Sequence, residues 1–76
     1  MNRLRRKELA ALQQRIEIIK NELESLREEE EFYFENMPEG IQNSELGERS
    51  QAAIDNMEYA EGSLDEALEN IEQAQA

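Results

Sequence analysis

Apolar residues recur along the first half of the chain with alternating spacings of three and four positions. The residues concerned are Leu9, Leu12, Ile16, Ile19, Leu23 and Leu26. This is the spacing of the a and d positions of a heptad repeat, which places all of them on one side of an α-helix. We therefore expect a long helix over residues 3–35 that packs lengthwise against another helix.

A turn is expected where this pattern stops. Pro38 ends the helix, because proline lacks a backbone N–H and constrains the residue before it, and Gly40 follows closely. Residues 36–44 then form the connection. Asn43 or Ser44 is expected to be the N-cap of the next helix, with its side chain accepting from a free backbone N–H.

The heptad pattern returns in the second half, which predicts a second helix over residues 45–75. Its predicted seam consists of Leu46, Ser50, Ala53, Met57, Ala60, Leu64, Ala67, Ile71 and Ala74. Gly62 and Ser63 could break this helix, but the repeat passes through them without a change of phase. We therefore expect one continuous helix.

Two helices joined by a short connection pack antiparallel, so the sequence predicts an all-α hairpin, with residues 1–76 as a single domain. Alanine occupies every seventh position of the second helix, which is expected to let the two backbones approach closely. The predicted register is given by three facing pairs: Leu9 with Ile71, Ile16 with Leu64, and Leu23 with Met57.

Several apolar side chains fall outside the predicted seam. Helical hairpins that carry such residues commonly meet a second copy or another protein. The residues that we expect at a dimer or partner interface are Ile18, Phe32, Phe34, Ile54 and Tyr59. We expect two hairpins to associate as a homodimer and form a four-helix bundle.

Charge is unevenly distributed in this chain of net charge −11. Residues 1–27 hold seven basic and four acidic residues, whereas residues 28–76 hold one basic and fifteen acidic residues. Such a surface repels nucleic acid and anionic membranes and suits a basic protein partner, for example a nucleic-acid-binding protein; a purely solubilising role is the alternative. The acidic face is expected on the second helix, at Glu58, Glu61, Asp65 and Glu69.

The composition argues against an enzyme. The chain has no cysteine and no histidine, which removes the thiol nucleophile, the commonest general base and the commonest transition-metal ligand. We find no glycine-rich phosphate loop, and we expect no cofactor or metal. The alternative is a Mg²⁺-dependent nucleotide hydrolase of the all-α type, in which pairs of acids on facing helices hold the ion. The candidate pairs are Glu28 with Glu31, Glu45 with Glu48, Glu58 with Glu61, and Glu69 with Glu72.

The sequence also predicts a location. The basic start is not followed by the apolar stretch of a signal peptide, and no run approaches the roughly 20 apolar residues that span a bilayer. We expect a cytoplasmic protein with no membrane contact.

The segment FENMPEGIQNSELGE, residues 34–48, resembles the turn of a family of small acidic helical proteins from Gram-positive bacteria and their phages. The matching residues are Asn36, Met37, Pro38, Glu39, Gln42, Ser44, Glu45 and Gly47, while Gly40, Ile41 and Leu46 depart from the pattern. The resemblance implies a phage or mobile-element context and an accessory role, such as blocking a host or defence protein. It implies no catalytic mechanism.

Overall fold

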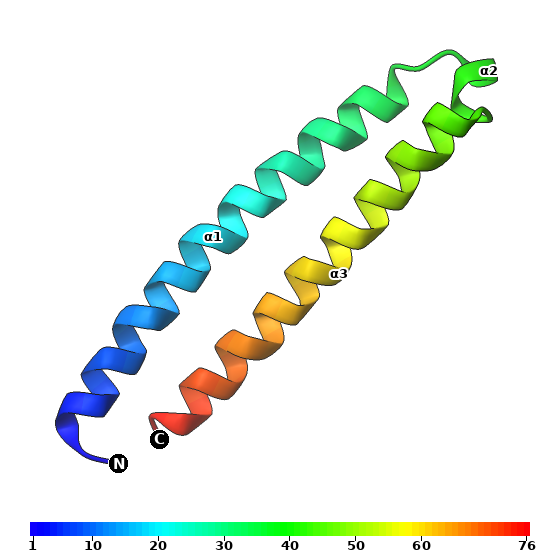
Figure 1. Ribbon diagram of the computed structural model, residues 1–76. Coiled ribbons are helices and arrows are strands. Elements are labelled where there is room, and N and C mark those ends of the chain that lie inside the picture. Colours follow the sequence, from blue (N-terminus) through cyan, green and yellow to red (C-terminus); the bar gives the residue numbers. More distant parts are fainter.

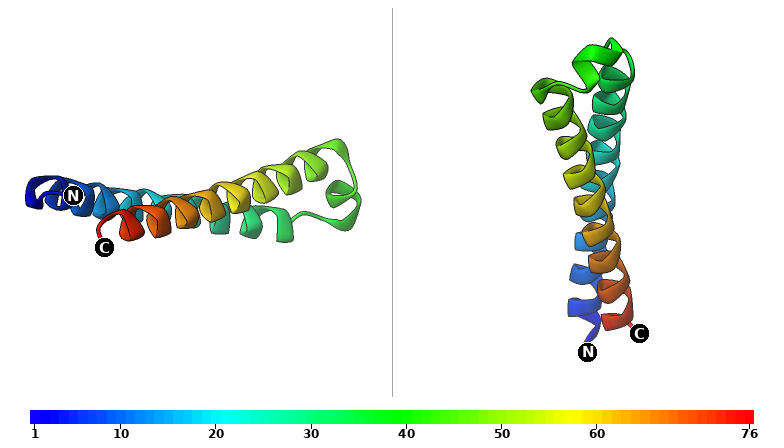
Figure 2. Two further views of the ribbon diagram at one scale, coloured as in Figure 1. Left: turned by 90° about the horizontal axis from the view of Figure 1, so that it is seen from below. Right: turned by 90° about the vertical axis from the view of Figure 1, so that its right-hand side faces the viewer.

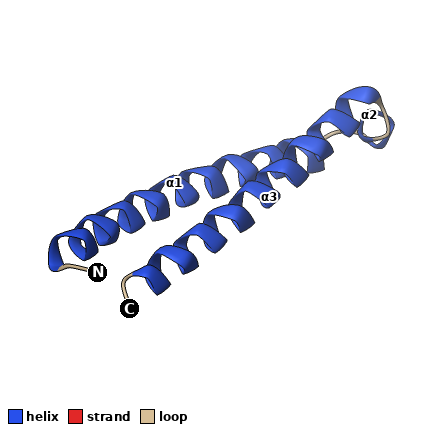
Figure 3. Cartoon of the chain, turned by 60° about the horizontal axis from the view of Figure 1, so that its bottom comes forward, coloured by secondary structure: helices blue, strands red, loops and turns tan.

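The computed structural model describes residues 1–76 as two long antiparallel helices joined at one end by a compact corner (Figure 1). Helix α1 spans Arg3–Glu35 and helix α3 spans Glu45–Ala74, with the short helix α2, Glu39–Gln42, between them. Apart from the short connections the chain is helical throughout (Figure 3). The predicted all-α hairpin is therefore confirmed.

The molecule is a rod whose Cα atoms extend over 58 × 15 × 12 Å. Both chain termini lie at one end of the rod and α2 lies at the other (Figure 1). The two further views show that α1 and α3 cross at a shallow angle along their length (Figure 2). Neither long helix carries the continuous apolar stretch that crossing a bilayer requires.

The ends of the long helices are held by local hydrogen bonds. Asn2 caps α1, since its side-chain oxygen accepts from the backbone N–H of Arg5 at 2.8 Å. At the other end of α1, the Asn36 side chain donates to the carbonyl of Phe32 at 2.7 Å. Helix α3 runs unbroken through Gly62, as expected, because the heptad pattern keeps its phase there.

The corner differs from the simple turn that the sequence predicts, because it contains α2. Ser44 occupies the N-cap position of α3, but its hydroxyl donates to the carbonyl of Ile41 and does not accept from the first turn of α3. The predicted N-cap position of Ser44 is therefore confirmed, but the predicted hydrogen bond to its side chain is not formed. Gln42 stabilises the corner as well, since its side-chain amide donates to the carbonyl of Phe34 at 3.0 Å.

Gly47 allows α3 to begin directly against α2. A Cβ atom at this position would lie 2.0 Å from the carbonyl oxygen of Gln42, a distance at which the backbone would have to move. Gly47 is buried, so the close approach belongs to the packed part of the corner. Only glycine meets this requirement.

The contact between the long helices uses part of the predicted seam together with a neighbouring row of residues on each helix. We call the facing residues the contact rows. The contact row of α1 consists of Leu9, Gln13, Ile16, Lys20, Leu23, Arg27, Glu30 and Phe34. The contact row of α3 consists of Gly47, Ser50, Ile54, Met57, Glu61, Leu64, Leu68, Ile71 and Gln75.

Part of the predicted seam therefore lies outside the contact. In α1 the predicted seam residues Leu12, Ile19 and Leu26 are exposed, and Gln13, Lys20 and Arg27 take their place. In α3 the predicted alanine seam is displaced likewise: Leu46, Ala60 and Ala74 are exposed, while Ala53 and Ala67 are half-buried at the edge. The prediction that a row of alanines lies between the two helices and lets their backbones approach closely is therefore wrong.

The polar links between the helices match the predicted register only in part, because Lys20–Asp65, Arg27–Glu61 and Gln13–Gln75 join residues five to eight positions away from the predicted pairs. Ser50 donates to Glu30 at 2.5 Å, which agrees with the predicted pairs. At the open end Gln75 donates to Gln13 at 2.8 Å, although that register places Gln13 opposite Ala67. Helical side chains lean toward the N-terminus of their own helix, so two long side chains of antiparallel helices meet when their Cα atoms are offset.

Candidate interaction surfaces

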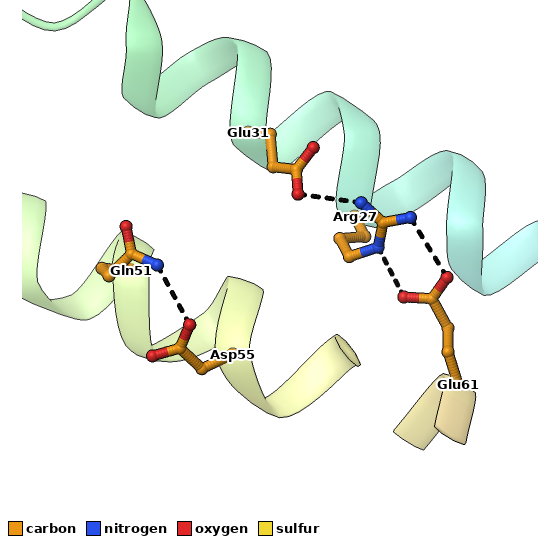
Figure 4. A network of polar contacts seen from close by, with 5 residues as sticks. All are labelled: Arg27, Glu31, Gln51, Asp55 and Glu61. Carbon is orange, nitrogen blue, oxygen red and sulfur yellow. Dashed lines mark hydrogen bonds and ion pairs between the residues drawn. The ribbon is translucent and has the colours of Figure 1, made fainter. Parts of the chain in front are cut away.

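Arg27 joins the two long helices at the middle of the hairpin. Its guanidinium donates to both carboxylate oxygens of Glu61, at 2.5 and 3.3 Å, and to Glu31 at 2.8 Å (Figure 4). The side chains of Arg27 and Glu61 are only 18% and 12% exposed. The hydrogen bond to Glu61, with a second contribution from Glu31, raises the pKa of Arg27. The carboxylate of Glu61 is therefore occupied by the ion pair that links the two helices.

A second ion pair joins Lys20 of α1 to Asp65 of α3. The hydrogen bond with Asp65 is the main cause that raises the pKa of Lys20 above its ordinary value. With the Gln13–Gln75 and Ser50–Glu30 hydrogen bonds, polar links therefore cross the contact at several levels along the rod. The hairpin is held by these links as well as by apolar packing.

The acidic residues predicted as one face do not form one free surface. Glu61 and Asp65 are paired with cations of α1, whereas Glu58 and Glu69 are exposed. Beyond Arg15, each remaining cation of the chain has an acidic partner: Lys20, Arg27 and Arg49. The unpaired charge from there to the C-terminus is consequently all negative.

An open depression lies on the outer side of α3, and we call it the Tyr59 depression. It is lined by Asp55, Glu58, Tyr59, Gly62, Ser63 and Glu66. Gly62 leaves the space that a side chain would fill, since a Cβ atom there would meet nothing within 4 Å. Tyr59 is 78% exposed, and the side chain of Asp55 accepts from Gln51 at 3.0 Å (Figure 4). Carboxylates around an exposed aromatic ring can bind an organic cation.

A second surface consists of the apolar seam residues that the contact leaves uncovered, and we call it the open apolar face. Its α1 members are Leu12, Ile19, Leu26 and Tyr33, and its α3 members are Leu46, Ala53, Ala60, Ala67 and Ala74. The α1 side chains are between 43% and 56% exposed. The heptad pattern did single out these residues, but as the contact between the two helices of one chain.

The residues predicted for a dimer or partner interface are scattered. Ile54 is 4% exposed and packs inside the hairpin, so it is not available to a partner. Phe34 is half-buried beside Ile54. Ile18 and Phe32 are exposed on the side of α1 that faces away from α3, and Tyr59 is exposed on the outer side of α3. These five residues do not converge on one surface.

The acid pairs proposed for a magnesium site are engaged elsewhere or dispersed. Glu31, Glu45 and Glu61 each form an ion pair with an arginine. No group of three or more acidic side chains is arranged to hold a metal ion.

Comparison with protein-family models, with curated proteins and with solved structures finds no match to this chain.

Proposed function

We propose that this protein is a non-enzymatic protein–protein interaction module whose acidic surface binds a basic segment of another protein. The observation that carries the proposal is the Tyr59 depression, where Asp55, Glu58 and Glu66 surround an exposed ring. No cation of the chain forms an ion pair with any of these three carboxylates. Their charge is therefore available to a partner.

The chemistry of the depression suits arginine or lysine side chains. A guanidinium can donate in parallel to a carboxylate and stack on an aromatic ring, and such stacking contributes about 0.5–1 kcal/mol at an exposed site. Asp55 is oriented by its hydrogen bond from Gln51, which lowers the cost of arranging the site. The long-range attraction of an acidic rod would also accelerate encounter with a basic partner.

The resemblance of the turn to that of small phage and bacterial proteins supports a more specific role. In a mobile-element context, an acidic module would serve to block a host or defence protein. Proteins that bind nucleic acid carry basic surfaces, and carboxylates spaced along a rod can occupy the place of phosphates. We propose a nucleic-acid-binding protein as the target class.

The test is a titration of the ¹⁵N-labelled protein with an arginine-rich peptide, followed by NMR. We expect the largest shifts in residues 55–66. The triple variant Asp55→Asn, Glu58→Gln, Glu66→Gln should bind at least about ten-fold more weakly, because it loses three charge-assisted contacts. Binding by the wild type should weaken steeply as salt is raised.

The matched control removes the same charge elsewhere, with Glu8, Glu17 and Glu28 changed to Gln; all three are exposed on α1 and form no ion pair. This control should bind as the wild type does. Equal weakening in both triple variants would show that only net charge matters, and the assignment to the depression would be wrong. A bacterial protein retained by the wild type and the control, but not by the depression variant, would be the natural partner.

A further inference from the structure

The open apolar face lacks charge, in a chain with 19 acidic residues. Its α1 row and its α3 row contain only Leu, Ile, Tyr and Ala between residues 12 and 74. Leu12, Ile19, Leu26 and Tyr33 are nonetheless between 43% and 56% exposed. A surface that remains in water would be expected to contain acidic residues in such a chain. Their absence indicates that another molecule covers this face.

The two rows lie on the same side of the hairpin. Leu12 directly precedes Gln13 of the α1 contact row, and Ala60 directly precedes Glu61 of the α3 contact row. Both apolar rows are therefore displaced from the contact in the same rotational sense about their own helix. Because the helices run in opposite directions, the same sense brings both rows to one side of the pair.

The opposite side of the hairpin is acidic. Its edge is formed by residues that directly follow members of the contact rows: Glu17, Glu24 and Glu31 in α1, and Glu58, Asp65 and Glu72 in α3. The hairpin thus has one apolar side and one acidic side. Covering the apolar side would leave the acidic side in water.

The angle between the contact stripe and the apolar stripe of each helix matches the geometry of a four-helix bundle. Adjacent residues of a heptad helix are about 103° apart around its axis. A contact stripe that contains Gln13 instead of Leu12 therefore has its centre rotated by about 50° from the centre of the apolar stripe. In a square bundle the centre lies about 45° from the direction of each neighbouring helix. The apolar stripes of α1 and α3 therefore both point to an axis above the pair, where two more helices would complete a core.

The hairpin alone has almost no core. Three of its 76 residues are buried, and Ile54 is the sole apolar side chain among them. Chains of this size commonly gain a sufficient core by oligomerisation. A second hairpin would supply the two missing helices in one step.

We propose that a second copy of this chain docks on the open apolar face and completes a four-helix bundle. The two-fold axis runs parallel to the rods, so both corners lie at the same end and α1 of each copy lies over α3 of the other. The large side chains of Leu12, Ile19 and Leu26 then meet the alanines of the α3 row of the second copy. Large against small is the packing that fills a core without voids.

Charges beside the face agree with this arrangement. Glu29 borders the α1 row and Arg49 borders the α3 row, and both lie near the corner. With the corners together, Glu29 of each copy lies near Arg49 of the other. The opposite orientation would stack α1 on α1 and α3 on α3, so that large side chains crowd together and the alanines leave voids.

The assembly is tested by sedimentation equilibrium at micromolar concentration. We expect the wild type at twice its mass of 8.9 kDa. Ile19→Glu should lower the association constant at least about a hundred-fold, because each dimer would bury two new carboxylates. Ile18→Glu is the matched control, since Ile18 is similarly exposed but faces away from α3, and it should remain dimeric.

Two outcomes would overturn the proposal. One is a folded wild-type monomer over the whole concentration range, which would assign the face to a different protein. The other is an Ile19→Glu variant that dimerises as well as Ile18→Glu does. The wild-type result does not depend on whether either variant folds.

The orientation is tested with a nitroxide label on Gly40→Cys, a change that meets no neighbouring atom in a chain without native cysteine. Corners at the same end predict a short distance between the two labels. A distance near the 58 Å length of the rod would overturn the proposed axis. The acidic Tyr59 depression is not part of this interface, so failure of the dimer and failure of the proposed function are separate results.

Discussion

Four residues of the turn, Asn36, Gln42, Ser44 and Gly47, build the corner. Asn36 and Gln42 donate to carbonyls at the end of α1, and Ser44 donates to Ile41. Gly47 lets α3 begin against α2. The geometry of the corner therefore explains the residue types at these positions.

Gly47 and Gly62 are predicted to respond in opposite ways to the same substitution. Gly47→Ala should destabilise the hairpin by at least about 2 kcal/mol, because the new methyl group overlaps the Gln42 carbonyl. Gly62→Ala should stabilise it by about 0.5–1 kcal/mol, since alanine is the better helix former and the space is open. Thermal unfolding followed by circular dichroism measures both, and a Gly47→Ala melting temperature equal to that of the wild type would contradict the close approach.

At the scale of the helices, the limits of α1 could be predicted, but the face that it presents to α3 could be predicted only in part. Pro38 decides where α1 must end, because the reason is local and steric. The direction of the contact depends on what else surrounds the helix. An apolar stripe shows that a helix is covered, but it does not say how many neighbours share the covering.

The contact row could have been found from a different signal. Gln13, Lys20 and Arg27 recur every seventh residue, and Glu61 and Gln75 lie at matching levels of α3. Complementary polar side chains at matching levels of an antiparallel pair therefore mark this row in the sequence. The apolar a and d pattern does not include these polar residues. Because Glu61 pairs with Arg27, reversing its charge would destabilise the hairpin, so the effect on partner binding could not be read separately.

Arg27 is predicted to contribute more to stability than Arg49. Arg27→Met leaves Glu61 largely covered and without a partner, so it should lower the melting temperature clearly. Arg49→Met removes a pair within α3 whose side chains are 75% and 77% exposed, and it should have little effect. If both variants melt at the same temperature by circular dichroism, Arg27 does not hold the helices together.

The molecule as a whole separates its charge from its apolar side. Unpaired cations are confined to the first fifteen residues, at the open end of the rod, and the remainder presents carboxylates. The apolar side faces the proposed second copy, while the Tyr59 depression faces outward on α3. One hairpin could thus dimerise and still display two acidic depressions, which would give a bivalent rod.

Ala60 tests this whole-molecule arrangement, because a leucine there has no role inside one hairpin. Ala60 is exposed in the hairpin, so Ala60→Leu should leave an isolated monomer near its original stability. In the proposed bundle it faces the large α1 row of the second copy, where overpacking costs about 1–3 kcal/mol. The wild-type melting temperature should rise with protein concentration, and the variant should lose much of that dependence.

Ala52→Leu is the control, because Ala52 is exposed on the outer side of α3, and it should behave as the wild type does. An Ala60→Leu variant that dimerises as tightly as Ala52→Leu would mean that the alanine row does not meet α1 of a second copy.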